Sequence, residues 1–167
     1  VHIYGSVFRS LRYALFQVAS IITTTGYATA DFNTWPAFSK AILVILMFVG
    51  ACAGSTGGGI KVSRVLLLWK ILKRNIRQVL QPRKVMVVRT NGQMVDEKIL
   101  SNTNAYLAAY VIIIVFSFLL VTLDGFSVTT CFTAVVACFN NIGPGLEMVG
   151  PTGNFAMFGG LPKIVLI

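Results

Sequence analysis

The sequence is poor in charge, and poorest in acidic residues. Only 11% of its 167 residues are charged and only 5 are Asp or Glu, whereas 56% are hydrophobic and the mean hydropathy is +0.79. An ordinary soluble domain carries about 25% charged residues. The shortage of charge excludes such a domain and predicts that the chain lies in a lipid bilayer.

Residues that carry chemistry are also scarce. The one histidine is His2, and Cys52, Cys131 and Cys138 form no Cys-x-x-Cys pair. This spacing offers no metal-ligand set, and no nucleophile, base and acid fall together in the apolar segments. We therefore predict a non-enzyme without an organic cofactor, with a membrane-anchored enzyme as the weaker alternative, and we interpret the cysteines as small core residues. The chain opens without a cleavable signal pattern, and we expect it to be a piece of a longer protein.

Positive charge is concentrated in one stretch. Nine of the 14 Lys and Arg residues fall between Lys61 and Arg89, where there is no Asp or Glu. Because the basic residues are not interleaved with stacking aromatics, we expect no nucleic-acid partner despite the net charge of +9. A basic stretch beside an apolar segment is typical of a cytoplasmic flank under the positive-inside rule, which places Arg9 and Arg12 on the opposite side. A specific partner site on this basic face remains the alternative.

Two apolar segments are long enough to cross a bilayer. Residues 102–123 contain no charge, which predicts one spanning helix. The other segment begins near Trp35 and Pro36 and passes into the glycines of residues 54–59, which are poor helix formers. The second segment is therefore predicted to be a broken helix.

The chain after Lys61 is predicted to leave the membrane. VSRVLLLWKILKRNIRQVL has apolar residues at helical spacing and cations on the other face, which indicates an amphipathic helix that Pro82 ends. Asn91-Gly92 then stands between two short alternating runs, which predicts a small cytoplasmic β-hairpin with a type I′ turn.

Two further apolar stretches are too short to cross the bilayer. LRYALFQVASII is followed by TTTGYAT, and FSVTTCFTAVVACF is followed by NNIGPG, so each is predicted to be a half-helix that enters the membrane and turns back at a glycine. Non-helical backbone at membrane depth is tolerated only where protein or water satisfies its polar groups. Each bend is therefore a candidate pore lining.

The two half-helices belong to an internal repeat. Aligning Gly26 with Gly143 superposes the half-helices and their loops, and Lys40 then falls near Lys163 in the helix that follows. Such units can place several loops around one axis, where backbone carbonyls replace the hydration shell of a cation. Neither loop carries a carboxylate, which favours a monovalent over a divalent ion.

Four ordered motifs carry a resemblance to a known family. ITTTGYAT with a following WP, GACAGSTGGGIKVSR, NNIGPGLEMVGP and GNFAMF together resemble the TrkH-like membrane subunit of the Trk-type potassium uptake proteins, within the superfamily of K⁺ transporters. The resemblance implies an all-α polytopic membrane protein of membrane–pore–membrane repeats with re-entrant half-helices and a small cytoplasmic β-hairpin. Residues 1–81 would be the third repeat from its pore helix onward, 82–98 a cytoplasmic linker and hairpin, and 99–167 the fourth repeat up to the start of its last helix.

The resemblance also implies the site and the partners. Potassium uptake would cross the bacterial plasma (inner) membrane through a multi-pass protein, with K⁺ as the only metal. A homodimer and a cytoplasmic nucleotide-binding regulatory subunit (TrkA-like) would be its partners, the latter near the basic helix and hairpin. The implied filter residues are Thr23, Thr24, Thr25, Gly26, Asn140, Asn141, Ile142 and Gly143, and the implied gate is Gly54, Ser55, Thr56, Gly57, Gly58, Gly59 and Lys61, followed by Arg64.

Three alternatives compete with this interpretation. The glycines before Lys61 do not form a phosphate-binding loop, because Ile60 separates them from the lysine and Val62 stands where Ser or Thr is required. A Na⁺-coupled Ktr-type subunit and a non-conducting structural membrane subunit stay open. Asp124 and Glu147 are interpreted as extracellular rim residues, and Trp35 and Tyr27 as interfacial anchors or filter packing.

Overall fold

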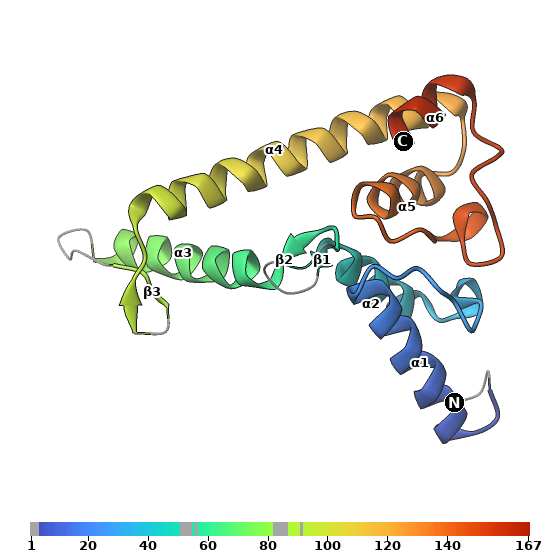
Figure 1. Cartoon of the computed structure of the whole chain (residues 1–167), viewed down its shortest axis with the longest axis horizontal. Coiled ribbons are helices and arrows are strands. Elements are labelled where there is room, and N and C mark those ends of the chain that lie inside the picture. Colours follow the sequence, from blue (N-terminus) through green and yellow to red (C-terminus); the bar gives the residue numbers. More distant parts are fainter. Residues whose placement is uncertain (1–3, 51–54, 56, 82–86, 91) are drawn as a thin grey trace.

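The structure, a computed structural model, describes residues 4–50, 55, 57–81, 87–90 and 92–167. This part of the chain is mostly helical, with two short two-stranded ladders (Figure 1). The α-helices are α1 Val7–Ile22, α2 Ala37–Phe48, α3 Val62–Leu80, α4 Glu97–Val121, α5 Val128–Phe139 and α6 Gly160–Leu166. The strands are β1 Val49–Gly50, β2 Ile60–Lys61, β3 Arg89–Thr90 and β4 Gln93–Met94, and three 3₁₀ turns lie at Phe32–Thr34 (η1), Thr122–Asp124 (η2) and Glu147–Val149 (η3).

Helix α4 is the long apolar element. Together with η2 it forms a stretch of 28 residues, Glu97–Asp124, whose 18-residue apolar window has a mean hydropathy of 2.6. It is the one helix of the described residues that is long and apolar enough to cross a membrane. The helix predicted over residues 102–123 is therefore confirmed. Helices α2 and α5 have 12 residues each, too few for the roughly 20 that a spanning helix needs.

The apolar segment that begins near Trp35 is interrupted. Helix α2 ends at Phe48 and α3 begins at Val62, and between them β1 pairs in parallel with β2, with Val49 opposite Ile60. The break was predicted, but the parallel ladder was not. It brings the two ends of the intervening glycine stretch together, and the approach is close, because a Cβ on Gly50 would lie 2.1 Å from the carbonyl oxygen of Gly58.

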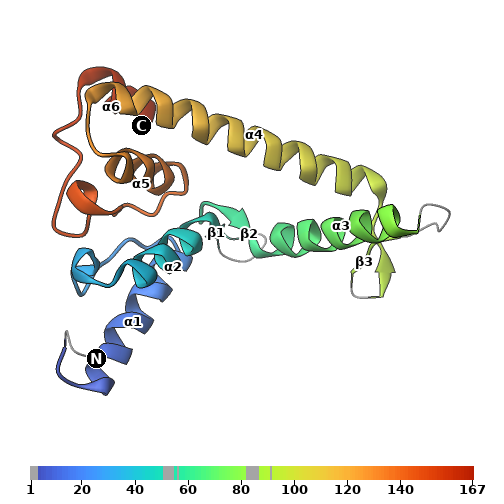
Figure 2. The same ribbon diagram turned by 180° about the vertical axis from the view of Figure 1, so that it is seen from behind.

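Helix α5 is the centre of the packing. One hydrophobic cluster joins it to α4 and to the segment before α6, through residues such as Tyr110, Val135 and Phe158. A second cluster joins it to α1 and α2, through residues such as Leu43 and Val136. Viewed from either side, α5 accordingly lies between α4 and the α1–α2 pair (Figures 1 and 2).

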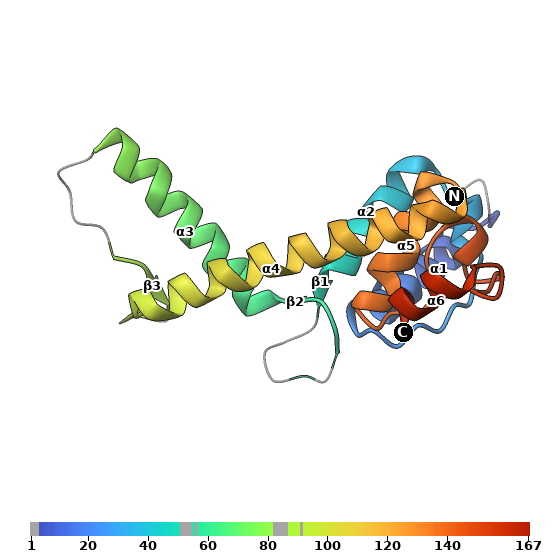
Figure 3. The same cartoon turned by 90° about the horizontal axis from the view of Figure 1, so that it is seen from above.

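The basic half of the chain forms a separate arm. Helices α3 and α4 meet near the β3–β4 ladder, where Ile71, Val88 and Leu100 form a small core. Helices α1, α2, α5 and α6 lie at the other end of the molecule (Figure 3). Strand β3 pairs antiparallel with β4, and an ion pair joins Arg74 to Glu97 at 2.5 Å. Pro82 and Asn91, which carried the predicted helix end and turn type, lie outside the described residues.

Candidate functional site

Helix α1 ends in a left-handed bend. Thr24 has φ 54°, and the N–H of Thr25 donates to the carbonyl of Ser20 at 2.9 Å. This is the six-residue hydrogen bond of a Schellman motif, in which a left-handed residue closes the helix and turns the chain away. Gly26 follows with φ 77°. We call residues 23–26 the first glycine bend.

Helix α5 ends in the same way. Asn141 has φ 55°, the N–H of Ile142 donates to the carbonyl of Ala137 at 2.8 Å, and Gly143 has φ 101°. Each of these features occupies the position expected when Gly143 is aligned with Gly26. We call residues 140–143 the second glycine bend, and the two bends share one backbone motif although their matched residues are 117 positions apart.

The two bends lie against each other. A Cβ on Gly26 would stand 2.2 Å from the carbonyl oxygen of Ile142, so no side chain fits there without a shift of the backbone. Glycine at this position therefore serves both the positive φ and the close approach. The structure thus places the two segments predicted as filter strands next to each other, with Gly26 against Ile142 and Gly143.

The carbonyl oxygens of both bends have no hydrogen-bond donor among the residues that the structure describes. In the described part of the chain, none of the eight carbonyls of residues 23–26 and 140–143 accepts a hydrogen bond from another residue. Carbonyls away from bulk water are almost always satisfied, and inside a bilayer an unsatisfied one is costly. Water or a cation is the partner that such a group of oxygens can take.

The glycine stretch between β1 and β2 contacts both bends. A Cβ on Gly57 would lie 2.9 Å from Oγ1 of Thr24, and a Cβ on Gly58 would lie 1.9 Å from the carbonyl oxygen of Asn140. We call residues 54–59 the glycine segment. Of its predicted gate residues, Gly54 and Thr56 lie outside the described residues, whereas Gly57 and Gly58 lie directly beside the predicted filter.

Lys61 holds the glycine segment from its carboxyl side. Its Nζ donates to the carbonyl oxygen of Ser55 at 3.0 Å, to Oγ of Ser55 at 3.1 Å, and to the carbonyl oxygen of Gly57. The ammonium group is therefore bound to main-chain oxygens of the segment itself. The positive charge of Lys61 is thereby bound to Gly57, which is next in sequence to Gly58, the residue that contacts the second bend.

Buried polar side chains of the half-helices hold the strands that leave the bends. Oγ of Ser20 donates to the carbonyl of Tyr27 at 2.6 Å, and the amide oxygen of Gln17, when turned toward the loop, accepts from Thr29 N at 2.9 Å. After the second bend, Oγ1 of Thr133 accepts from Leu146 N at 3.0 Å. These residues were not predicted from the sequence, although a polar residue within an otherwise apolar helix is a signal that could have found them.

A polar clamp joins the segments that follow the two bends. The amide of Asn33 donates to the carbonyl of Glu147 at 3.0 Å and accepts from its N–H at 2.7 Å. The Glu147 carboxylate accepts from Ser127 Oγ and, at 2.8 Å, from Thr130 Oγ1. The hydrogen bonds from these hydroxyls, of which the one from Ser127 has the larger effect, lower the pKa of the Glu147 carboxyl below its ordinary value.

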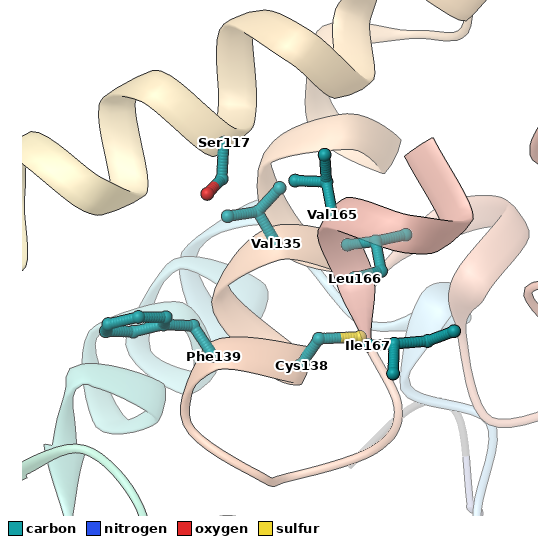
Figure 4. A pocket seen from close by; sticks show the side chains of 7 residues that line it. All are labelled: Ser117, Val135, Cys138, Phe139, Val165, Leu166 and Ile167. Carbon is teal, nitrogen blue, oxygen red and sulfur yellow. The ribbon is translucent and has the colours of Figure 1, made fainter. Parts of the chain in front are cut away.

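A pocket of about 120 Å³ lies elsewhere, between α4, α5 and α6 (Figure 4). The side chains that line it are apolar apart from the hydroxyl of Ser117 and the thiol of Cys138, so no set of polar side chains converges there. No group of three or more His, Cys, Asp or Glu side chains gathers anywhere in the described ranges. The glycine bends are therefore the best candidate site. The pocket is lined by Ser117, Val135, Cys138, Phe139, Val165, Leu166 and Ile167.

A long apolar helix beside two short helices that end in unpaired, non-helical bends is typical of membrane transport proteins with re-entrant segments. The chain belongs to the TrkH family, described as a cation transport protein, which matches residues 6–167. The resemblance found in the sequence motifs is thereby confirmed.

Similar proteins span the whole of this chain. The Trk system potassium uptake protein TrkH of Salmonella typhimurium is 37% identical over 166 residues, which cover 99% of this chain and 34% of that protein. The corresponding protein of Escherichia coli K12 is 36% identical with the same coverage. The crystal structure of the potassium transporter TrkH from Vibrio parahaemolyticus matches with a TM-score of 0.89 and 36% identity, over 99% of this chain and 35% of that one. The chain thus spans about a third of the length of these relatives.

Proposed function

We propose that this chain forms part of the potassium pathway of a multi-pass transporter in the bacterial inner membrane. The observation that carries the proposal is the pair of adjacent glycine bends whose carbonyl oxygens have no hydrogen-bond donor among the described residues. Relatives that are 36–37% identical over the same stretch are named potassium uptake proteins. Residues 1–81 and 99–167 would be the third and fourth of its membrane–pore–membrane repeats, joined by the linker and hairpin of residues 82–98.

The chemistry of the bends suits a monovalent cation. In this proposal, carbonyl oxygens of residues 23–26 and 140–143 replace water around K⁺. Helices α1 and α5 both end at the bends, so the partial negative charge of their carboxyl ends falls where the cation passes. The bends contain no carboxylate, whereas a divalent ion would require several charged oxygens.

The glycine segment would close the pathway next to the bends. Gly57 and Gly58 already contact Thr24 and Asn140, and Lys61 holds the segment through the carbonyls of Ser55 and Gly57. A segment rich in glycine can change conformation at low steric cost. Opening would then require that the segment leave the bends and that Lys61 exchange its carbonyl partners.

The full-length protein is expected to act with partners. We propose a homodimer with a cytoplasmic nucleotide-binding regulatory subunit of the TrkA-like kind. The exposed basic side chains of α3, such as Lys73 and Arg77, together with the β3–β4 ladder, would face the regulator or the anionic headgroups.

Substitution of the two glycines in the full-length transporter tests the filter. Gly26→Val and Gly143→Val should abolish potassium uptake or lower the K⁺/Na⁺ flux ratio without preventing membrane insertion. Gly125→Val is the matched control, because Gly125 also has a positive φ, of 78°, but a Cβ added to it would have no atom within 4 Å. Unchanged flux in both bend variants would favour a non-conducting structural subunit, and uptake that requires Na⁺ would favour the Ktr-type alternative.

A second experiment tests the gate. Deleting one glycine of the segment, or replacing Lys61 by Met, should raise basal uptake because the segment loses its length or its tether. Lys73→Met is the control, since it removes the same charge from the exposed side of α3. Basal uptake that stays at the wild-type level in both gate variants would argue against the assignment.

A further inference from the structure

Asn140, the first residue of the second bend, is anchored by a residue of the long helix. The hydroxyl of Tyr110 on α4 donates to Oδ1 of Asn140 at 2.7 Å. Both side chains are buried, with 4% and 0% of their surface exposed. A hydrogen bond in such surroundings is well defined in geometry, because neither partner can exchange it for water.

The first bend has no equivalent anchor among the residues that the structure describes. Thr23 occupies the position that matches Asn140, and its Oγ1 bonds only locally, to the carbonyl of Ala19 and to Oγ1 of Thr25, both at 2.7 Å. The backbone motif of the bend therefore forms without a tether to another helix. The Tyr110–Asn140 bond must contribute something other than the shape of the bend.

Asn140 also contacts the glycine segment. A Cβ on Gly58 would lie 1.9 Å from the carbonyl oxygen of Asn140 and 2.8 Å from its Cα. The residue held by Tyr110 through its side chain is thus the residue against which Gly58 rests through its main chain. Any displacement of Asn140 would alter this contact directly.

Tyr110 and its neighbour Tyr106 also contact residues that precede and follow the glycine segment. The Tyr110 ring lies 6.5 Å from that of Phe48, the last residue of α2, and 6.0 Å from that of Tyr106. The guanidinium of Arg64, in the first turn of α3, lies 4.0 Å above the Tyr106 ring. Helix α4 therefore contacts the chain on each side of the segment as well as the second bend.

The Asn140 amide depends on this one bond. Its Nδ2 is buried and has no hydrogen-bond partner in the described part of the chain. A buried amide that lost Tyr110 as well would keep no side-chain hydrogen bond, which is costly, so it would move toward water or another donor.

We propose that Tyr110 is a positioning residue of the ion pathway, whose hydroxyl fixes Asn140 and thereby holds the second glycine bend against the glycine segment. The inference rests on the proposed function of the two bends. It adds a residue of α4, outside every motif of the pathway, on which ion selectivity depends.

Tyr110→Phe in the full-length transporter tests the proposal, because it removes the hydroxyl and keeps the ring. We expect about a fivefold fall in the K⁺/Na⁺ flux ratio per folded molecule, as loss of one neutral hydrogen bond of about 1 kcal/mol would give. Tyr106→Phe is the matched control: it lies one turn away on α4, keeps the ring under Arg64, and removes a hydroxyl that has no hydrogen bond among the described residues. An unchanged ratio in Tyr110→Phe, or an equal fall in Tyr106→Phe, would overturn the proposal.

Two further measurements separate positioning from general stability. Asn140→Ala removes the same bond from the other side, and combining it with Tyr110→Phe should lower the ratio no further than Asn140→Ala alone. If the double variant shows the sum of two independent losses, the bond is not the cause. If Gly26→Val and Gly143→Val change the ratio while Tyr110→Phe does not, this inference fails alone. If none of the three changes it, the proposed function fails too.

Discussion

The two glycine bends have the same backbone but are held in different ways. In the first, hydroxyl groups of Thr23 and Thr25 bond to each other and to the preceding helix, and both residues are exposed in this chain. In the second, Asn140 is fully buried and bonded to Tyr110 on another helix. The first bend is therefore closed by local contacts, and the second is part of the tertiary core.

This difference separates two requirements of the site. Each bend consists of a helix end, a residue with left-handed φ and a glycine two positions later, all of which are close in the sequence. The position of a bend relative to its neighbours needs contacts between distant residues. At the first bend, Gly26 lies against Ile142, and at the second, Asn140 is bonded to Tyr110 and follows the buried helix α5.

The largest expected effect is a difference in potassium uptake between alanine substitutions at Gly26 and at Gly143. Alanine at either position has to adopt a positive φ, which costs about 1–2 kcal/mol. At Gly26 the new Cβ also meets the Ile142 carbonyl oxygen at 2.2 Å, whereas at Gly143 the nearest atom is 3.9 Å away. We expect Gly26→Ala to abolish potassium uptake and Gly143→Ala to reduce it by about tenfold or less, as measured by initial rates in cells. Equal losses would show that strain alone, and not the contact between the bends, limits transport.

The next largest expected effect is a difference in basal uptake between alanine substitutions at Gly58, which contacts the second bend, and at Gly57, which contacts the first. Gly58→Ala places a Cβ 1.9 Å from a main-chain oxygen of the second bend, whereas Gly57→Ala meets the Thr24 hydroxyl at 2.9 Å, which can rotate away. We expect Gly58→Ala to raise basal uptake several-fold, because the segment has to withdraw, and Gly57→Ala to change it little. The reverse order would mean that the segment is seated mainly on the first bend.

A smaller effect concerns the clamp that joins the segments after the bends. Asn33→Ala removes two hydrogen bonds to Glu147 that span 114 residues. At about 0.5–1.5 kcal/mol per bond, the expected loss of folding stability is about 1–2 kcal/mol in this exposed setting. Thermal unfolding of the purified full-length protein measures it. Asn154→Ala, which removes only a local bond to the N–H of Ala156, should leave the melting temperature almost unchanged.

The smallest effect is a dependence of stability on pH at Glu147. Its carboxyl pKa is lowered by hydrogen bonds from Ser127 and Thr130. The carboxylate therefore stabilises the fold above the unfolded-state pKa, and this contribution is lost as the pH falls through the lower, folded-state pKa. The group is exposed, so the contribution is less than about 1 kcal/mol. The stability difference between wild type and Glu147→Gln should be constant near neutral pH and shrink only in acid, whereas a difference that vanishes near pH 7 would contradict the assignment.

Much of the fold could be predicted because it depends on local patterns. The uncharged run of residues 102–123, the glycines that interrupt the helix after Phe48, and the two short apolar stretches each have a length and a periodicity that can be read directly. The predicted filter residues could be chosen because the motifs around the two bends resemble those of a known family. The boundaries of the repeats and the turn type at Asn91-Gly92 stay predictions.

The contacts that place the site could not be predicted in this way. Three contacts join residues that no local pattern relates. They are the parallel pairing of β1 with β2, the hydrogen bonds between Asn33 and Glu147, and the hydrogen bond between Tyr110 and Asn140. Tyr110 lies in the apolar run AYVIIIVFSFLLV, where hydropathy alone treats it as one more membrane residue.

The sequence by itself predicted a membrane protein, and it determined where the helices break and which glycines permit left-handed backbone. Each of these depends on residues within a few positions of one another. Only the tertiary structure decided that Gly26 meets Ile142, that Gly58 rests on Asn140, and that Tyr110 holds Asn140 in place. Those contacts arise from the packing of α5 between α4 and the α1–α2 pair, and shape complementarity between distant segments leaves no periodic trace in the sequence.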